Sequence, residues 1–257
     1  MTFEPTPIPI PIDRLAPSRR PLGHAVMYQS WRSLLFLHWA FPPEIVRALL
    51  PPGLELDTFD GKAYVGLVPF TMRGIRPRGL PAVPWLSNFH ETNVRTYVHV
   101  EGSDPGVWFF SLDAANPVAV ALAKTWFHLP YYHATMSLTT EACSGTLTYA
   151  SQRNRPSTQG SAIASVRCIP QGDSGPVEVN TLDHFLVERY FLYAFARGYL
   201  FRGQVHHTPY PIQNADLLTF EETLLAATGL RRPETSPIVH FSHGVDVEIF
   251  SLIKLSK

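Results

Sequence analysis

Short runs of β-branched and aromatic residues, separated by Gly, Pro, Asn and Asp, recur along most of the chain and predict β-strands. The run 31–39 (WRSLLFLHW) is mostly apolar and predicts a buried strand. Asp60-Gly61 separates two apolar runs and predicts a hairpin. Further strands are expected at 89–100, 107–113, 212–222 and 239–255, with an antiparallel meander at 136–142, 145–152 and 161–169.

Four segments predict helices, at 44–50, 118–127, 182–198 and 223–229. The second follows Asn116-Pro117, a favoured N-cap and first helical residue. The third is the longest: Thr181 is its expected N-cap, its apolar positions follow a helical period, and Gly198 suits its C-cap. Strands and helices together predict one mixed domain that is rich in antiparallel strands.

The N-terminal residues 1–21 form a Pro-rich arm, and residues 22–257 are expected to fold as a single domain. The arm is expected to wrap the domain or a neighbour through Ile8, Ile10 and Ile12, or else to be disordered. A second Pro-rich segment, 72–84, predicts a loop and carries Arg73, Arg76 and Arg78. These arginines are either solvated or able to capture an anion.

Composition excludes several kinds of partner. The 257 residues are 45% hydrophobic and only 16% charged, with 21 basic and 21 acidic residues, so nothing favours nucleic acid or an anionic membrane. Cys143 and Cys168 are expected to be reduced thiols. No apolar run reaches membrane-spanning length and the N-terminus lacks the order of a signal peptide, so a cytoplasmic location is expected.

The segment 89–98 (FHETNVRTYV) has the composition of a strand but does not alternate apolar and polar residues in the usual way. One side of such a strand carries Glu91, Asn93, Arg95 and Tyr97. If this side faces water, the segment is an ordinary half-buried strand with a surface ion pair of little energetic value. If it faces inward, the four polar side chains indicate a ligand site, because unpaired buried charges are costly.

Other candidate chemistry is sparse. Lys124 is the only lysine, arginine or carboxylate between Asp113 and Glu141, and it either reaches solvent or pairs with Glu91 in a cavity. The eleven histidines show no metal-binding spacing, so no metal and no cofactor are expected. The chain also lacks the GxSxG, GxxxxGK[ST] and GxGxxG signatures of serine hydrolases, P-loop enzymes and dinucleotide oxidoreductases.

Five ordered motifs carry a family resemblance: LLFLHW, LDTFDGKAYVGLVPF, FHETNVRTYV, GVWFFSLDA and LPYYHATM. They resemble the YqjF-like bacterial proteins, a family known only as a domain of unknown function, from about residue 31 to the C-terminal strands. That family is similar to the acetoacetate decarboxylase superfamily. The resemblance implies an α+β fold: a mostly antiparallel, strongly bent β-barrel or cone with peripheral helices and a central cavity, into which the polar side of 89–98 would face.

The superfamily similarity rests on Glu91, which matches a strand glutamate, and on segment 121–134. There the decarboxylases read Ala-x-x-Arg-Glu and, four residues on, Pro-Lys-Lys-x-Ala. At the same spacing this chain has Lys124 for the arginine and Tyr131 for the Schiff-base lysine, followed by Tyr132. A phenol cannot form an imine, so decarboxylation by that route is not implied. The match with an arginine favours charge pairing for Lys124.

The resemblance and the residues together favour an enzyme that acts on a small carbonyl or carboxylate compound. Its expected catalytic residues are Glu91 as acid or base, Lys124 (or Arg95) holding an anionic group, and Tyr131 (or Tyr132) donating a hydrogen bond to an oxyanion. The expected ligand-binding residues are Asn93, Arg95, Tyr97, Trp108, Phe110 and Tyr132, with Trp126 as a further wall. A non-catalytic sensor of a small organic ligand, and a scaffold with a filled interior, are the alternatives. The superfamily often forms oligomers, so a homo-oligomer is compatible with the resemblance.

Overall fold

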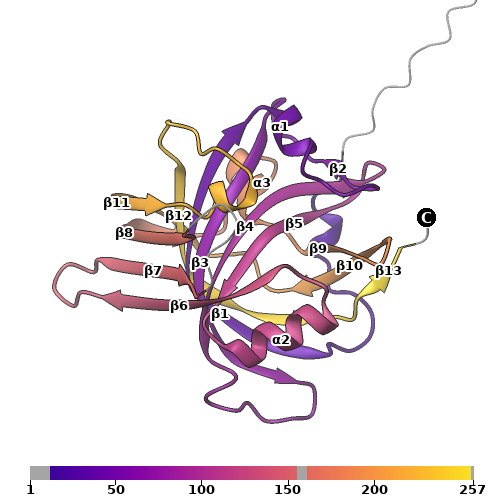
Figure 1. The fold of residues 1–257 in the computed structure, drawn as a ribbon, viewed down its shortest axis with the longest axis horizontal. Coiled ribbons are helices and arrows are strands. Elements are labelled where there is room, and N and C mark those ends of the chain that lie inside the picture. The colour runs from indigo at the N-terminus through magenta and orange to yellow at the C-terminus, as the bar shows by residue number, and fades with distance from the viewer. Residues whose placement is uncertain (1–11, 155–160, 256–257) are drawn as a thin grey trace, which may run out of the picture.

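The computed structural model describes residues 12–154 and 161–255, and strands predominate in them (Figure 1). The strands are β1 (Met27–Phe41), β2 (Glu55–Leu56), β3 (Ala63–Pro77), β4 (Phe89–Val100), β5 (Ser103–Ala114), β6 (Tyr131–Thr140), β7 (Leu147–Arg153), β8 (Ile163–Gly175), β9 (Phe191–Ala196), β10 (Tyr199–His206), β11 (Ile212–Glu222), β12 (Ile238–Ile249) and β13 (Ile253–Lys254). The helices are α1 (Pro43–Arg47), α2 (Pro117–Trp126) and α3 (Leu182–Val187), with 3₁₀ turns η1 (Ala16–Ser18) and η2 (Ala226–Thr228).

The strands of the described chain form one strongly curved sheet in which seven of them close on themselves. The closed order is β1–β3–β4–β5–β9–β10–β12 and back to β1, and we call it the inner ring. Pairing is antiparallel except where β6 and β9 each join β5 in parallel. The predicted fold class, α+β with a mostly antiparallel and strongly bent sheet, is therefore confirmed.

Strands β1, β3 and β4 separate two hydrophobic interiors. On one face, side chains such as Phe36, Phe70 and Tyr97 pack inside the inner ring together with Phe185 of α3. On the other face, a second core is shared with β7, β8 and β11 and includes Leu35, Leu37, Leu67, Val94, Tyr149 and Val166. Strand β4 is buried on both faces, which explains why its sequence lacks a clear apolar and a clear polar side.

A paired irregularity in β1 and β12 sets which side chains enter the inner ring. Ser33 has a φ of 52° and interrupts the alternation of β1. Before it, the odd-numbered Trp31 faces into the inner ring; after it, the even-numbered Leu34 does. Gly244 of β12 lies opposite Arg32 with a φ of 127°. A Cβ at Gly244 would collide with the carbonyl oxygen of Trp31, so this position requires glycine.

The expectation of a long helix over 182–198 is wrong. Only α3 is helical; the rest of the segment contains β9 and a tight turn at Arg197 and Gly198, where φ is 53° and 78°, which leads into β10. Pairing of β9 with β5 and of β10 with β12 supplies the backbone partners that override the helical period. The other three expected helices are present, but α1 and η2 are shorter than expected.

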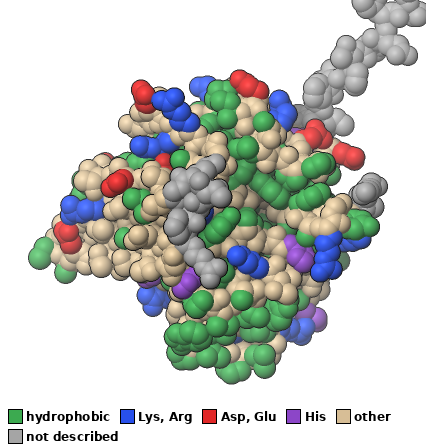
Figure 2. All heavy atoms as spheres, in the orientation of Figure 1, with side chains coloured by type: hydrophobic (Ala, Val, Ile, Leu, Met, Phe, Trp, Pro, Cys, Tyr) green, Lys and Arg blue, Asp and Glu red, His purple; other side chains and the backbone are tan. Residues whose placement is uncertain are grey.

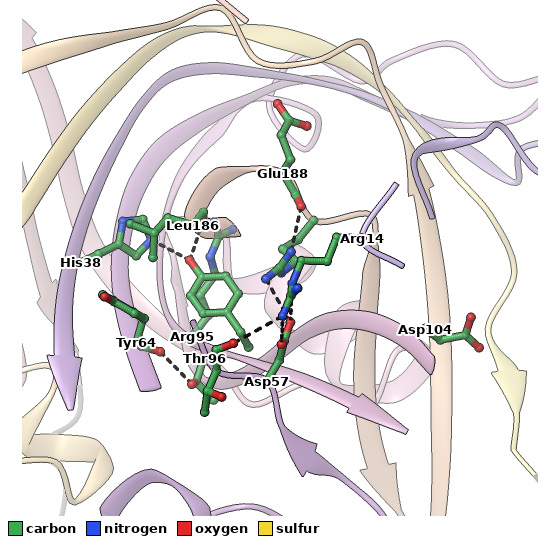
Figure 3. Close-up of polar contacts among 12 residues, drawn as sticks. Arg14, His38, Asp57, Tyr64, Arg95, Thr96, Asp104, Leu186 and Glu188 are labelled. Atoms are coloured by element: carbon green, nitrogen blue, oxygen red, sulfur yellow. Dashed lines mark hydrogen bonds and ion pairs between the residues drawn. The ribbon is translucent and has the colours of Figure 1, made fainter. Parts of the chain in front are cut away.

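The part of the N-terminal arm that the structure describes is tied to the domain; Ile8 and Ile10 lie outside the described residues. Arg14 forms an ion pair with the buried carboxylate of Asp57, which Arg189 also contacts at 3.2 Å (Figure 3). Arg20 binds Glu248 of β12 at 2.6 Å. The segment 12–21 is thus fixed by charge pairing with the sheet.

Three smaller expectations can be compared with the structure. The segment 72–84 is only partly a loop, because β3 continues to Pro77, and its three arginines are exposed. Cys143 is exposed and Cys168 is buried, and both are free thiols. Within residues 12–154 and 161–255, none of the helices has the length and apolar character needed to span a membrane.

Candidate functional site

The inner ring contains a cavity of about 290 Å³. Helix α3 lies at one end, where the carbonyl oxygen of Leu186 accepts a hydrogen bond from Arg95, and the other end opens between the 78–88 loop and α2. These two sides of the opening are connected, since Asn116 caps α2 through its Oδ1 and donates from Nδ2 to the carbonyl oxygen of Trp85 at 3.1 Å. Figure 2 shows hydrophobic side chains gathered on the part of the surface where Figure 1 places α2.

Strand β4 directs three of its polar side chains into the cavity. Glu91, Asn93 and Arg95 alternate along β4, so a two-residue period puts them on the same face, and all three line the cavity. Their exposed fractions are only 2%, 4% and 9%. The side of 89–98 that carries these residues therefore faces inward, which answers the question left open by its sequence.

Glu91 and Tyr131 form the central hydrogen bond of the cavity. The Tyr131 hydroxyl donates to Glu91 Oε2 at 2.8 Å. Burial raises the pKa of Glu91 to about 8; hydrogen bonds from Tyr131 and Asn93 oppose this shift, and the nearby charge of Asp113 adds to it. Burial and the Glu91 charge hold the pKa of Tyr131 well above its usual value. At neutral pH the Glu91 carboxyl group is mostly protonated and can donate a proton.

Arg95 brings a positive charge to the closed end of the cavity. Its guanidinium donates to the carbonyl oxygen of Leu186 at 3.2 Å and lies 5.5 Å from the ring centre of Phe36 (Figure 3). No carboxylate of the described residues forms a salt bridge with Arg95, and its Nε has no hydrogen-bond partner among them. Asn93 Oδ1 is likewise buried and unpartnered. The cavity thus presents a cation and an amide oxygen with free hydrogen-bonding capacity.

Tyr97 continues the polar side of β4 but does not line the cavity. Its hydroxyl donates to the carbonyl oxygen of Leu186 at 2.5 Å, so it accepts from His38 Nε2 at 2.7 Å (Figure 3). Burial lowers the pKa of His38 well below its usual value, which agrees with a neutral ring protonated on Nε2. Tyr97 therefore holds α3 through the Leu186 carbonyl oxygen and does not contact a ligand in the cavity.

Lys124 and Tyr132 lie apart from Glu91, contrary to expectation. Lys124 is on the exposed side of α2, with its Nζ 5.6 Å from the Tyr132 ring. Tyr131 pairs with Leu112 and Tyr132 with Asp113 across the sheet, so adjacent positions of β6 face opposite sides. The outward Tyr132 ring stacks on Arg153 at 3.9 Å.

The expected aromatic walls are also only partly correct. Trp108 packs against the cluster around Val98, and Phe110 packs against the second core, so neither lines the cavity. Phe109, between them, lines the cavity in their place; it lies opposite Arg95, next to a register shift in the β4–β5 pairing. Trp126 lines the opening, as expected.

Sequence reasoning missed a buried ion pair behind the site. Arg153 Nε donates to Asp113 Oδ1 at 2.8 Å, and both side chains are almost fully buried. Burial raises the pKa of Asp113 to about 6, although the Arg153 charge opposes the shift. Asp113 pairs with Thr92 and so lies on the opposite face of the sheet from Glu91. Only the conspicuous run of apolar residues around Asp113 hinted at a buried carboxylate.

The described residues offer no lysine for an imine at the cavity and no cluster of metal ligands. Lys62, Lys124 and Lys254 are exposed, and no lysine of the described chain lines the cavity. Across residues 12–154 and 161–255, no group of three His, Cys, Asp or Glu side chains is placed to hold a metal ion. The described chemistry of the cavity therefore rests on Glu91, Tyr131, Asn93 and Arg95.

A family model described as "Uncharacterized conserved protein" (DUF2071) matches residues 28–246. The chain belongs to this family. It is also 39% identical over 238 residues to the uncharacterized protein YqjF of Bacillus subtilis (strain 168), a match that covers 92% of this chain and 95% of YqjF. The predicted resemblance to YqjF-like proteins is confirmed.

Several solved structures share the fold of this chain, and acetoacetate decarboxylase-like proteins are among them. The chain resembles acetoacetate decarboxylase from Legionella pneumophila with a TM-score of 0.60 and 16% identity, over 93% of this chain and 92% of that one. It resembles the enduracididine biosynthesis enzyme MppR, solved with pyruvate, with a TM-score of 0.60 and 16% identity, over 91% and 92% of the two chains. At these identities the likeness establishes the shared fold.

Proposed function

We propose that this DUF2071 protein is an enzyme that transfers a proton on a small oxo acid without forming an imine. Arg95 binds the carboxylate, Glu91 is the acid or base, and Tyr131 orients the Glu91 carboxyl group. The observation that carries the proposal is that a buried cation without a carboxylate partner and a carboxyl group with a pKa of about 8 line the same cavity. Pyruvate, the ligand of the MppR complex, is also a small oxo acid.

The proton transfer is proposed at the carbon next to the carbonyl group. An ionised Glu91 takes a proton from that carbon, the carbonyl oxygen becomes an enolate oxygen, and the carbon–hydrogen bond electrons form the new double bond. Glu91 then returns the proton to that carbon, which restores the oxo acid and leaves Glu91 ionised. The pKa of about 8 suits both directions near neutral pH, because an effective acid–base group has a pKa close to the working pH.

Hydrogen exchange tests this step directly. Short oxo acids incubated with the protein in D₂O should lose the NMR signal of the protons next to the carbonyl faster than in buffer alone. Glu91→Gln should remove the acceleration, and Glu141→Gln, at an exposed position, should leave it unchanged. If no member of the panel exchanges faster with the wild-type protein, the catalytic proposal is wrong.

The missing lysine predicts that no covalent adduct forms. Borohydride reduction in the presence of an oxo acid should leave the mass of every lysine-containing peptide unchanged, because an imine needs an amine at the cavity and the described lysines are exposed. Peptide mass spectrometry measures this result. A labelled Lys124 would contradict the placement of that residue outside the site.

Arg95→Met is expected to abolish binding of small carboxylates while raising the stability of the unliganded protein. Methionine fills a similar volume, and it removes a buried guanidinium whose desolvation is not repaid by any carboxylate of the described residues. We expect a gain of about 1–2 kcal/mol in the free energy of unfolding. Thermal unfolding with and without acids measures both effects.

The matched control for Arg95 is Arg153→Met, at a buried arginine that does have a carboxylate partner. Removing Arg153 leaves Asp113 uncompensated, so this variant should lose stability. A loss of stability in Arg95→Met as well would show that Arg95 serves the fold through Leu186 and would remove it from the ligand site.

A binding or sensor protein is the second candidate, and the absence of an imine-forming lysine from the described cavity favours it. Binding of oxo acids that depends on Arg95, together with no hydrogen exchange, would select this alternative. A location in the cytoplasm and the state of oligomerisation remain predictions from sequence.

A further inference from the structure

We propose that the ligand is an acid with an apolar tail, bound with its carboxylate at Arg95 and its tail directed toward the opening between the 78–88 loop and α2. This inference rests on the proposed function, because it assumes that Arg95 receives a carboxylate. It adds the class of acid: aliphatic or aromatic, and not a hydroxylated or sugar acid.

The order of side chains along β4 gives the direction. Arg95 lies deepest, Glu91 is four residues nearer the opening, and Phe89 follows at the end of the strand. At about 3.3 Å per residue, the backbone positions of Arg95 and Glu91 are roughly 13 Å apart. Extended arginine and glutamate side chains can bridge most of this distance, so a ligand held by its carboxylate at Arg95 can present its first carbons to Glu91 and Tyr131 and place whatever follows beside Phe89.

The section between Glu91 and the opening is walled by apolar side chains. From β3 it receives Phe70, Met72 and Ile75, and from α2 and its C-cap it receives Leu122, Trp126 and Phe127. An apolar tail would remove this surface from water, which is the main source of affinity for such a chain. The cavity volume of about 290 Å³ is at the lower end for small-molecule sites.

Polar side chains in this section already have partners. Gln29 accepts from Trp31 Nε1 at 2.8 Å and donates to the sulfur of Met27. Ser87 donates to the carbonyl oxygen of Ile75 and accepts from the Val83 amide. A hydroxylated tail would therefore lose its water without gaining hydrogen bonds, a costly exchange. In contrast, Asn93 Oδ1 and Arg95 Nε, at the closed end, are unpartnered among the described residues.

The rim of the opening is apolar and exposed, which suits the outer part of a tail. Val83, Leu122 and Trp126 line the cavity with exposed fractions of 51%, 38% and 60%. Burying these three side chains against an apolar tail would remove their apolar surface from water, which favours binding. Trp85, also in the 78–88 loop, is 65% exposed but does not line the cavity, so it provides a control of the same residue type.

A chain-length series tests the inference. Dissociation constants of the full chain should be measured by calorimetry for straight-chain 2-oxo acids from three to ten carbons, and for matching hydroxylated acids. We expect affinity to rise about fourfold for each added methylene until the tail reaches the rim, and then to level off. Trp126→Ser should weaken only the longest acids, whereas Trp85→Ser should change none.

The outcomes separate this inference from the proposed function. If short acids bind and added methylenes bring no gain, or if hydroxylated acids bind better, the apolar-tail inference is overturned while carboxylate binding stands. If no acid of any length binds, the proposed function fails as well. Tail-dependent binding that is unaffected by Arg95→Met would contradict the proposed orientation.

Discussion

The Glu91→Gln variant is expected to be more stable than the wild-type protein at pH 8 and to match it near pH 5. A buried carboxyl group with a pKa of about 8 keeps its proton in the folded state over a range in which the unfolded chain, with a pKa near 4.5, has lost it. Wild-type stability therefore falls as pH rises from about 4.5 to 8, with a slope of about 1.4 kcal/mol per pH unit from this group. Glutamine keeps an acceptor for Tyr131 and does not titrate.

The difference between Glu91→Gln and wild type should reach about 3–5 kcal/mol by pH 8 and then stay constant. Urea denaturation at a series of pH values measures it. Glu248 offers a control of opposite sign: the Arg20 hydrogen bond lowers its pKa, so the stability that it adds is present above pH 4.5 and is lost as pH falls further. Parallel pH profiles for wild type and Glu91→Gln would show that Glu91 titrates normally and is not poised for proton transfer.

Gly244→Ala is expected to cost at least about 3 kcal/mol of stability, because strain and collision act together. The backbone at Gly244 has a φ of 127°, and an added Cβ would collide with the backbone of Trp31 in the neighbouring strand. To relieve this collision, β1 would have to shift near Ser33, where its inward-facing positions change from odd-numbered to even-numbered residues. We therefore expect the thermal midpoint to fall by about 6–12 °C.

Gly102→Ala separates strain from collision. Gly102 also has a positive φ, of 72°, but open space surrounds the position that a Cβ would occupy. Its alanine variant should cost only about 1–2 kcal/mol, the usual penalty of the left-handed conformation. Thermal unfolding of the two variants measures this difference. Equal losses of stability would show that the collision with Trp31 adds nothing to the backbone strain.

Much of the fold could be predicted because local signals and tertiary pairing agree. Asn116 caps α2 as its sequence indicates, and Asp60-Gly61 forms a tight turn with φ of 48° and 73°, although the strand before it, β2, pairs with β4 and not with β3. The prediction for 182–198 failed because its aromatic spacing fits a helix, whereas pairing with β5 and β10 makes residues 191–196 a strand. The residue pattern within the segment does not show which distant strands will pair with it.

The site could be predicted where alternation along one strand sufficed. Glu91, Asn93 and Arg95 share a face of β4, and all reach the cavity. The prediction failed across elements: Lys124 depends on the rotation of α2, and Phe109 on a register shift in the β4–β5 pairing. Ser33 and Gly244 likewise changed the inward side of their strands by backbone geometry, which side-chain periodicity does not report.

The double burial of β4 bears on how mutational scans of this family should be interpreted. From Glu91 to His99 every side chain is enclosed by one interior or the other, so substitution should be poorly tolerated throughout the strand, whatever each residue does. Intolerance alone would not separate residues kept for chemistry from those kept for packing. The sign of the stability change would: neutral replacements of Glu91 and Arg95 should strengthen the fold, and truncation of Val94 or Val98 should weaken it.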